Sequence, residues 1–134
     1  MTHDEARAAL EGLFAAGWTA TPVAYDNVPF TPPPGLAPWI RLAIEGGETA
    51  QASFGGSVRR FRCTGTLRVA IQVARGTGTA GAYRLADQIG ALIAAAVIPG
   101  LALEAAAPAS EAGQADGPYF RLTVAVPFWH DDFR

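Results

Sequence analysis

The sequence contains no lysine, because all ten of its basic residues are arginine. Without lysine, the chain has no amine nucleophile and no residue that could form a Schiff base with a carbonyl substrate. It has a single cysteine, Cys63, so it cannot form an internal disulfide or a metal site held by several thiolates. These absences exclude several common kinds of catalytic and metal site.

Charge is scarce as well. Only 16% of the 134 residues are charged, and the formal net charge is −2. Nucleic-acid-binding domains usually carry a strong basic excess, so nothing in this balance favours DNA or RNA as a partner. The longest apolar run, around residues 89–99, is shorter than the about 20 residues of a membrane-spanning helix, and no signal peptide is recognisable. We therefore expect a single soluble domain that is made inside the cell and has no membrane partner.

What the sequence does contain is one long amphipathic strand, residues 61–73. Side chains alternate between the two faces of a strand, so this pattern predicts an apolar inner face and a mostly polar outer face. Thirteen residues span about 43 Å, which predicts that the strand overhangs a small core. The inner face comprises Phe61, Cys63, Gly65, Leu67, Val69, Ile71 and Val73.

The N-terminal half predicts a helix and three shorter strands. Thr2 and Glu5 form a capping-box pattern at the start of a helix over residues 2–16, with Gly17 as its C′ glycine. A short strand over residues 21–25 precedes a proline-rich extended loop. Two further strands follow, residues 39–45 and 48–54, with Ala50, Ala52 and Phe54 facing inward on the second. The intervening Gly46-Gly47 favours a tight hairpin turn.

The C-terminal half predicts a second helix over residues 79–97 and a short strand over residues 101–107. A polar loop over residues 109–118 then leads to a clean strand over residues 119–128, and the tail from Trp129 is expected to be loosely held. The order of elements predicts an α+β fold. Its sheet is mixed but mostly antiparallel, two helices pack on it, and one β-α-β crossover follows the long strand.

A glycine pattern, Gly76-x-Gly78-x-x-Gly81, follows the long strand and opens a helix, as in dinucleotide-binding domains. Glu104 lies at about the spacing of the residue that holds a ribose hydroxyl in those domains. However, their first strand is buried on both faces, whereas this one is polar on one side. We therefore interpret the glycines as a turn that opens the helix, and we expect no cofactor.

Metal and catalytic sites are not predicted. His130-Asp131-Asp132 and His3-Asp4-Glu5 offer ligand atoms, but both lie near the ends of the chain and neither has a spaced partner, so solvated ends are the favoured interpretation. Cys63 lies on the apolar face of its strand, which indicates a buried and inert thiol. With no paired carboxylates and no activated nucleophile in the pattern, we expect no enzymatic activity.

Two groups of residues are candidates for a subunit or partner interface. The arginines form a basic edge that serves either solubility and edge protection or contact with an acidic neighbouring subunit, while DNA contact is a weaker alternative. The aromatic residues face away from the core or lie in the tail, and they are either interface residues or buried by the helices. The candidates are Arg59, Arg60, Arg62, Arg68, Trp39, Trp129 and Phe133.

Six short sequence features are spread over nearly the whole chain, and their order and spacing are informative. They are Asp26-Asn27-Val28-Pro29-Phe30, Pro38-Trp39-Ile40-Arg41, Gly65, Gly76-Thr77-Gly78, Leu85-Ala86-Asp87-Gln88-Ile89 and Pro127-Phe128. In this order and spacing they resemble the phage tail terminator-like family of long-tailed phages and prophage-derived particles.

The resemblance implies a structural protein of the virion, located at the head-proximal end of the tail and assembled in the host cytoplasm. Members of the family are similar α+β proteins that close into a ring, typically a hexamer, which caps the tail tube and stops its polymerisation. The implied partners are further copies of the chain, the tail tube protein and the head-completion or connector protein, with DNA only as cargo passing through the lumen. The alternatives are a neighbouring head–tail joining protein or a small-molecule-binding domain.

Overall fold

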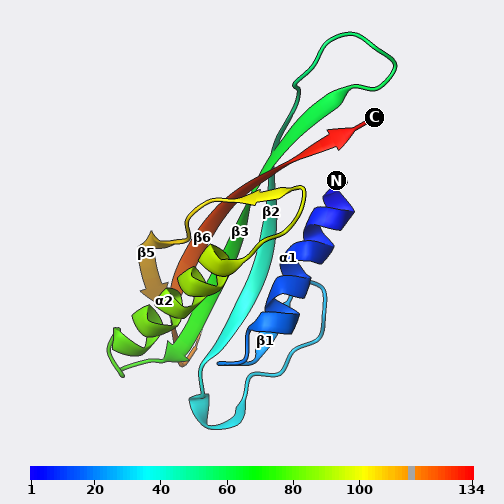
Figure 1. The fold of residues 1–134 in the computed structure, drawn as a ribbon. Helices are drawn as coiled ribbons and strands as arrows, with labels where there is room; N and C mark the ends of the chain where they lie inside the picture. Colours follow the sequence, from blue (N-terminus) through cyan, green and yellow to red (C-terminus); the bar gives the residue numbers. More distant parts are fainter. Residues whose placement is uncertain (115–116) are drawn as a thin grey trace.

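A computed structural model describes residues 1–114 and 117–134 of the chain. Two α-helices and one short 3₁₀ turn accompany six strands (Figure 1). In chain order, the elements are α1 (His3–Gly17), β1 (Val23–Tyr25), η1 (Pro34–Leu36), β2 (Trp39–Gln51), β3 (Arg60–Ala74), α2 (Ala80–Ala95), β4 (Leu101–Leu103), β5 (Ala107–Gln114) and β6 (Tyr119–Phe133).

The six strands form one sheet with the order β1-β2-β3-β6-β4, and β5 also pairs with β6. The β1–β2 pair is parallel, whereas the other described pairs are antiparallel. Since β3 and β4 both run antiparallel to β6, they run parallel to each other, and α2 connects them. The predicted α+β fold with a mostly antiparallel sheet and a β-α-β crossover is confirmed.

The core lies between one face of the sheet and the two helices. Ala6, Leu10 and Phe14 of α1 belong to the same buried cluster as Ile89 and Ile93 of α2. Sheet residues complete this cluster, including most of the predicted inner face of β3: Leu67, Val69, Ile71 and Val73. The prediction of the long strand and its apolar face is therefore confirmed.

The start of α1 is as predicted, but its end is not. The Thr2 hydroxyl accepts a hydrogen bond from the Glu5 N–H, and the Glu5 carboxylate accepts one from the Thr2 N–H. Gly17 is not a C′ glycine, because it is the last helical residue and extended Trp18 follows it as the C-cap. A Cβ at position 17 would lie 2.9 Å from Cδ1 of Leu92, so this glycine allows α1 to pack closely against α2.

The predicted hairpin at Gly46-Gly47 is wrong. β2 continues through both glycines to Gln51, and its register with β3 shifts between Gly46 and Thr49. A hydrogen bond of 3.0 Å from the Glu48 N–H to Thr64 Oγ1 ties the irregular segment to β3. Glycine thus marks a bulge here, and the chain reverses only at residues 52–59.

Two predictions for the C-terminal half are also wrong. Part of the polar loop predicted at residues 109–118 is strand β5, which pairs with β6 through partners such as Gly113 and Arg121. The remainder of that prediction includes residues 115–116, which lie outside the described residues. The tail from Trp129 is not loosely held, because β6 continues to Phe133 and stays paired with β3 to the end.

Three strands extend beyond the helices as a narrow ribbon (Figure 1). We call this ribbon the arm and define it as residues 47–63 of β2, β3 and their connection, together with residues 130–134. Figure 1 shows the connecting loop and the C-terminus projecting past the start of α1. The prediction that the long strand overhangs the core is therefore confirmed.

Candidate assembly surface on the arm

Arg62 lies at the centre of the polar contacts on the arm. Its guanidinium donates two hydrogen bonds to the Asp131 carboxylate, Nε to Oδ1 at 2.9 Å and NH2 to Oδ2 at 3.0 Å. The two residues are cross-strand partners of β3 and β6. The Arg62 guanidinium holds the pKa of Asp131 below its usual value, and the carboxylate raises the pKa of Arg62. The pair joins the two strands where they leave the core.

An aromatic ring supports the same arginine. The Arg62 guanidinium carbon lies 3.9 Å from the centroid of the Trp129 ring, a distance typical of a cation–π contact. Trp129 is half-buried. Arg62 of the predicted basic edge and Trp129, which was predicted to face away from the core, therefore stack on each other within one chain.

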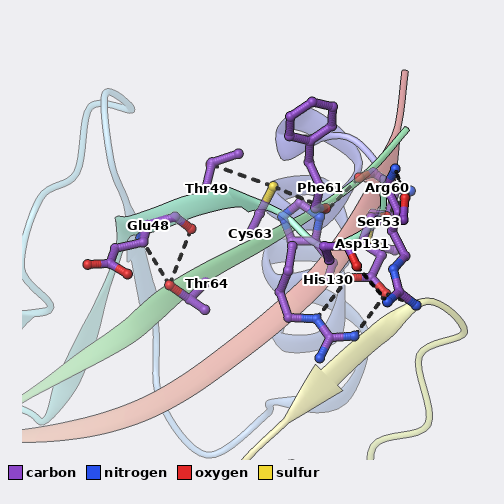
Figure 2. A network of polar contacts seen from close by, with 12 residues as sticks. Glu48, Thr49, Ser53, Arg60, Phe61, Cys63, Thr64, His130 and Asp131 are labelled. Carbon is purple, nitrogen blue, oxygen red and sulfur yellow. Dashed lines mark hydrogen bonds and ion pairs between the residues drawn. The ribbon is translucent and has the colours of Figure 1, made fainter. Parts of the chain in front are cut away.

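The other predicted arginines have different surroundings. Arg60 lies 4.0 Å from the Asp131 carboxylate and donates a hydrogen bond to the Ala52 carbonyl, in the network that Figure 2 shows. Arg68 pairs with Glu45 at 2.9 Å. The side chain of Arg59 is exposed, while its backbone exchanges two hydrogen bonds with Arg134. Three of the four arginines are thus paired with carboxylates of their own chain.

The structure buries one of the candidate aromatics. Trp39 is 8% exposed and packs with Ala24, Tyr119 and Phe30 in a small cluster. Trp39 therefore exposes little surface to an interface. Its environment matches the alternative prediction, in which the side chain is buried. The cover comes from the loop around Phe30 and from Tyr119, and not from the helices.

The arm carries exposed apolar side chains. Phe54 is 90% exposed, Val58 is 60% exposed and Phe133 is 62% exposed. The prediction that Phe54 faces inward is wrong, since the chain has left the strand at this position. Large apolar side chains grouped at an extremity are typical of surfaces that meet another protein. Phe133 was among the residues predicted from the sequence, whereas the two residues of the loop were missed.

A second group, on the other face of the arm, was also missed. His130 is 1% exposed, so the prediction of a solvated histidine is wrong for this residue. It lies directly opposite the buried Cys63 on β3, and its ring is 5.4 Å from the ring of His3. Burial is the main cause that lowers the pKa of His130. The alternation of β6 could have found it, because Val126, Phe128 and His130 share one face.

No helix in the described part of the chain is long and apolar enough to cross a membrane. A family model described as "Phage tail terminator protein" matches residues 5–128. The chain belongs to this family. Membership implies a structural protein of a phage tail that interacts with other tail proteins.

The fold of this chain also occurs in solved structures. Thirteen chains of known structure match this chain. One of them is 23% identical and covers 97% of this chain and 96% of its own, with a TM-score of 0.64. No curated protein matches this chain.

Proposed function

We propose that this chain assembles head to tail into a closed ring, a hexamer as its resemblance implies, at the head-proximal end of the tail. There it caps the tail tube, stops its polymerisation and presents a surface to the connector protein of the head. DNA passes only through the lumen, and assembly takes place in the host cytoplasm. The observation that carries this proposal is the arm, which projects from the core with Phe54, Val58 and Phe133 exposed.

The free strand edge supports contact between neighbouring copies. β1 pairs with β2 only as far as Leu42, so among the described residues no strand covers the outer edge of β2 from Ala43 onward. An uncovered edge is a template for pairing with another chain. A contact between two different surfaces of the same protein produces a ring when the rotation closes. The arm of one copy therefore reaches the body of the next.

The charged side of the arm contributes to the same contact. In the proposed ring, Arg59 and Phe133 meet the neighbouring subunit directly, because both side chains are exposed. Arg60, Arg62 and Trp129 mainly hold the strands of the arm in place. Arg68 joins β3 to Glu45 of β2 below the arm, and all of these residues offer their remaining exposed surface to the neighbour. Trp39 is left out of this contact because it is buried.

Light scattering tests ring formation. The native chain at micromolar concentration should form a ring-sized oligomer, either alone or when purified tail tube protein is added. The double variant Phe54→Asp, Val58→Asp should remain monomeric under both conditions with an unchanged melting temperature, since both side chains are exposed in the monomer. Val97→Asp is the matched control, because Val97 is 90% exposed, follows α2 and is not part of the arm, and this variant should assemble normally.

A native chain that stays monomeric with and without the tube protein contradicts the proposed ring. If the ring forms and the double variant also assembles, the arm is not the contact. Arg59→Glu tests the charged side separately, with the exposed α2 residue Arg84→Glu as its control. Loss of assembly only in Arg59→Glu supports contact with an acidic neighbour, whereas normal assembly of both variants means that the arginine serves solubility.

A further inference from the structure

Three side chains with metal-binding atoms converge at the base of the arm. His3 is the first residue of α1, Cys63 belongs to β3 and His130 belongs to β6. One ring nitrogen of each histidine and the sulfur of Cys63 all lie within 4.8 Å of one another. They are the only cysteine and both of the histidines in the sequence. The fold therefore brings together residues that are 60 or more positions apart in the chain.

The strand register fixes two of these residues. Cys63 and His130 are direct partners in the antiparallel β3–β6 pair, so their side chains emerge side by side on the same face of the sheet (Figure 2). Both are buried, with 0% of Cys63 and 1% of His130 exposed. Residues on two paired strands move little when a ligand binds. Cys63 and His130 are therefore two preformed ligands of a site.

A backbone carbonyl determines which ring nitrogen of His130 is free to bind a metal. Nδ1 lies 3.0 Å from the Met1 carbonyl oxygen. A carbonyl only accepts hydrogen bonds, so Nδ1 carries the proton and Nε2 keeps its lone pair. Histidines that bind metals characteristically donate the other ring N–H to a carbonyl or carboxylate in this way. His130 is therefore in the tautomer whose Nε2 is able to bind a metal.

We propose that His3, Cys63 and His130 bind one Zn²⁺ ion at the base of the arm. Thiolate and imidazole are the ligands that Zn²⁺ prefers, whereas Mg²⁺ and Ca²⁺ require oxygen ligands. Zinc bonds of about 2.3 Å to sulfur and about 2.0–2.1 Å to nitrogen place tetrahedral ligand atoms about 3.3–3.6 Å apart. The three ligand atoms lie within 4.8 Å of one another, so they draw closer together when the ion binds. The exposed His3 side chain, at the start of α1, is free to turn toward the ion.

There is room beside the cluster for a fourth ligand. A cavity of about 170 Å³ lies between α1 and the sheet, and its lining includes His3, Gly46, Thr64 and His130. A water molecule in this cavity completes the tetrahedron. The ion would join the first turn of α1 to both long strands. This inference concerns a single chain and stands whether or not the proposed ring forms.

The alternative is a buried thiol that only fills space. The Thr49 hydroxyl lies 3.7 Å from the Cys63 sulfur, and the thiol lies 3.9 Å from the Phe61 carbonyl oxygen. These long contacts satisfy a neutral thiol without any metal. Zinc binding replaces the thiol proton by the metal and releases that proton to solvent, with no change of oxidation state.

Titration with Co²⁺, a spectroscopic substitute for Zn²⁺, separates the two possibilities. The apo chain, kept reduced and freed of metal with a chelator, should bind one cobalt ion. It should develop the intense visible bands of a tetrahedral ion together with a thiolate-to-cobalt charge-transfer band, and Zn²⁺ should abolish both. Zn²⁺ should also raise the melting temperature, because it binds the folded chain and not the unfolded one.

Variants assign the ligands. Cys63→Ser should lose the charge-transfer band, and His3→Ala should weaken binding by at least about 10-fold, the lower bound for loss of even an outer partner of a metal. His3 is exposed, so its replacement leaves the fold intact and keeps the test valid if Cys63→Ser does not fold. Asp87→Ala, at an exposed position on α2, is the control and should bind normally. Absence of saturable binding by the native chain, or unchanged binding by His3→Ala, overturns the proposal.

Discussion

Gly65 lies directly opposite Phe128 on the neighbouring strand, and the Phe128 ring occupies the space that a side chain at position 65 would need. A Cβ at Gly65 would lie 2.5 Å from Cζ of that ring and 2.8 Å from the Glu45 carbonyl oxygen. The glycine thus allows a phenylalanine to cover the backbone where the sheet leaves the core.

This arrangement predicts different effects of alanine at two paired glycines. Gly65→Ala should lower the free energy of unfolding by about 1–3 kcal/mol, because the ring and a backbone carbonyl must move. Gly46, its partner on β2, has open space around it, so Gly46→Ala should leave stability unchanged or raise it by up to about 1 kcal/mol. Urea unfolding measures both. Equal effects of the two substitutions would contradict the role assigned to Phe128.

The contact between Arg62 and Asp131 predicts energetic coupling between the two residues. Arg62→Ala and Asp131→Ala should each lower the melting temperature, and the double variant should lose less than the sum of the two effects. The Arg68–Glu45 pair is the control: both arginine side chains are 42% exposed, but Glu45 is 55% exposed and Asp131 only 18%. Coupling should be smaller there, because solvent screens exposed pairs. Thermal melting of the single and double variants of both pairs measures the two coupling energies.

The capping box of α1 predicts a cost for losing the Thr2 hydroxyl. Thr2→Ala should destabilise the chain by about 0.5–2 kcal/mol, whereas Thr2→Ser, which keeps the hydroxyl, should be nearly neutral. The expected loss follows from the hydrogen bond of 3.1 Å that the hydroxyl accepts from the Glu5 N–H. Chemical denaturation at neutral pH is the measurement. An alanine variant as stable as the serine variant would show that the cap contributes nothing.

The burial of Tyr25 predicts that the chain loses stability in alkaline solution. Burial, aided by the charge of Glu11, raises the pKa of Tyr25 above its ordinary value of 10.0. The folded chain therefore favours the protonated phenol, and this contribution is complete below pH 10 and is lost as the pH rises through the folded pKa. Tyr25→Phe should show a smaller loss of stability than the native chain above pH 10. Denaturant midpoints across this range test the prediction, and parallel curves would contradict it.

The sequence predicted those elements whose periodicity is complete. The capping residues of α1 and the unbroken alternation of β3 identified both elements, because one face of each is buried against the core. Gly46-Gly47 misled the prediction, since a glycine pair serves a hairpin turn and a bulge equally well. β5 was missed because its residues are small and polar, and its pairing with β6 comes from the neighbouring strand rather than from its own pattern.

The candidate site was predicted only in part, for a related reason. The arginines and Phe133 could be proposed as candidates because charge and large apolar side chains are visible in the sequence. Contacts such as Arg62 with Asp131, and Cys63 with His130, depend on the register between β3 and β6. The residues after Phe128 were predicted to form a loosely held tail, so no register with β3 was predicted for them. None of the contacts at the end of β6 could therefore be predicted.

The extended pairing of β6 also connects two surfaces of the arm. His130 and Asp131 are consecutive residues of one strand, so their side chains point to opposite faces. One face holds the proposed cation and the other holds Arg62. A neighbour that competes for Asp131 would shift the backbone on which His130 stands, and a cation that fixes His130 would resist that shift. Because such linkage is reciprocal, zinc concentration would tune the strength of subunit association by the same factor by which association tunes zinc affinity.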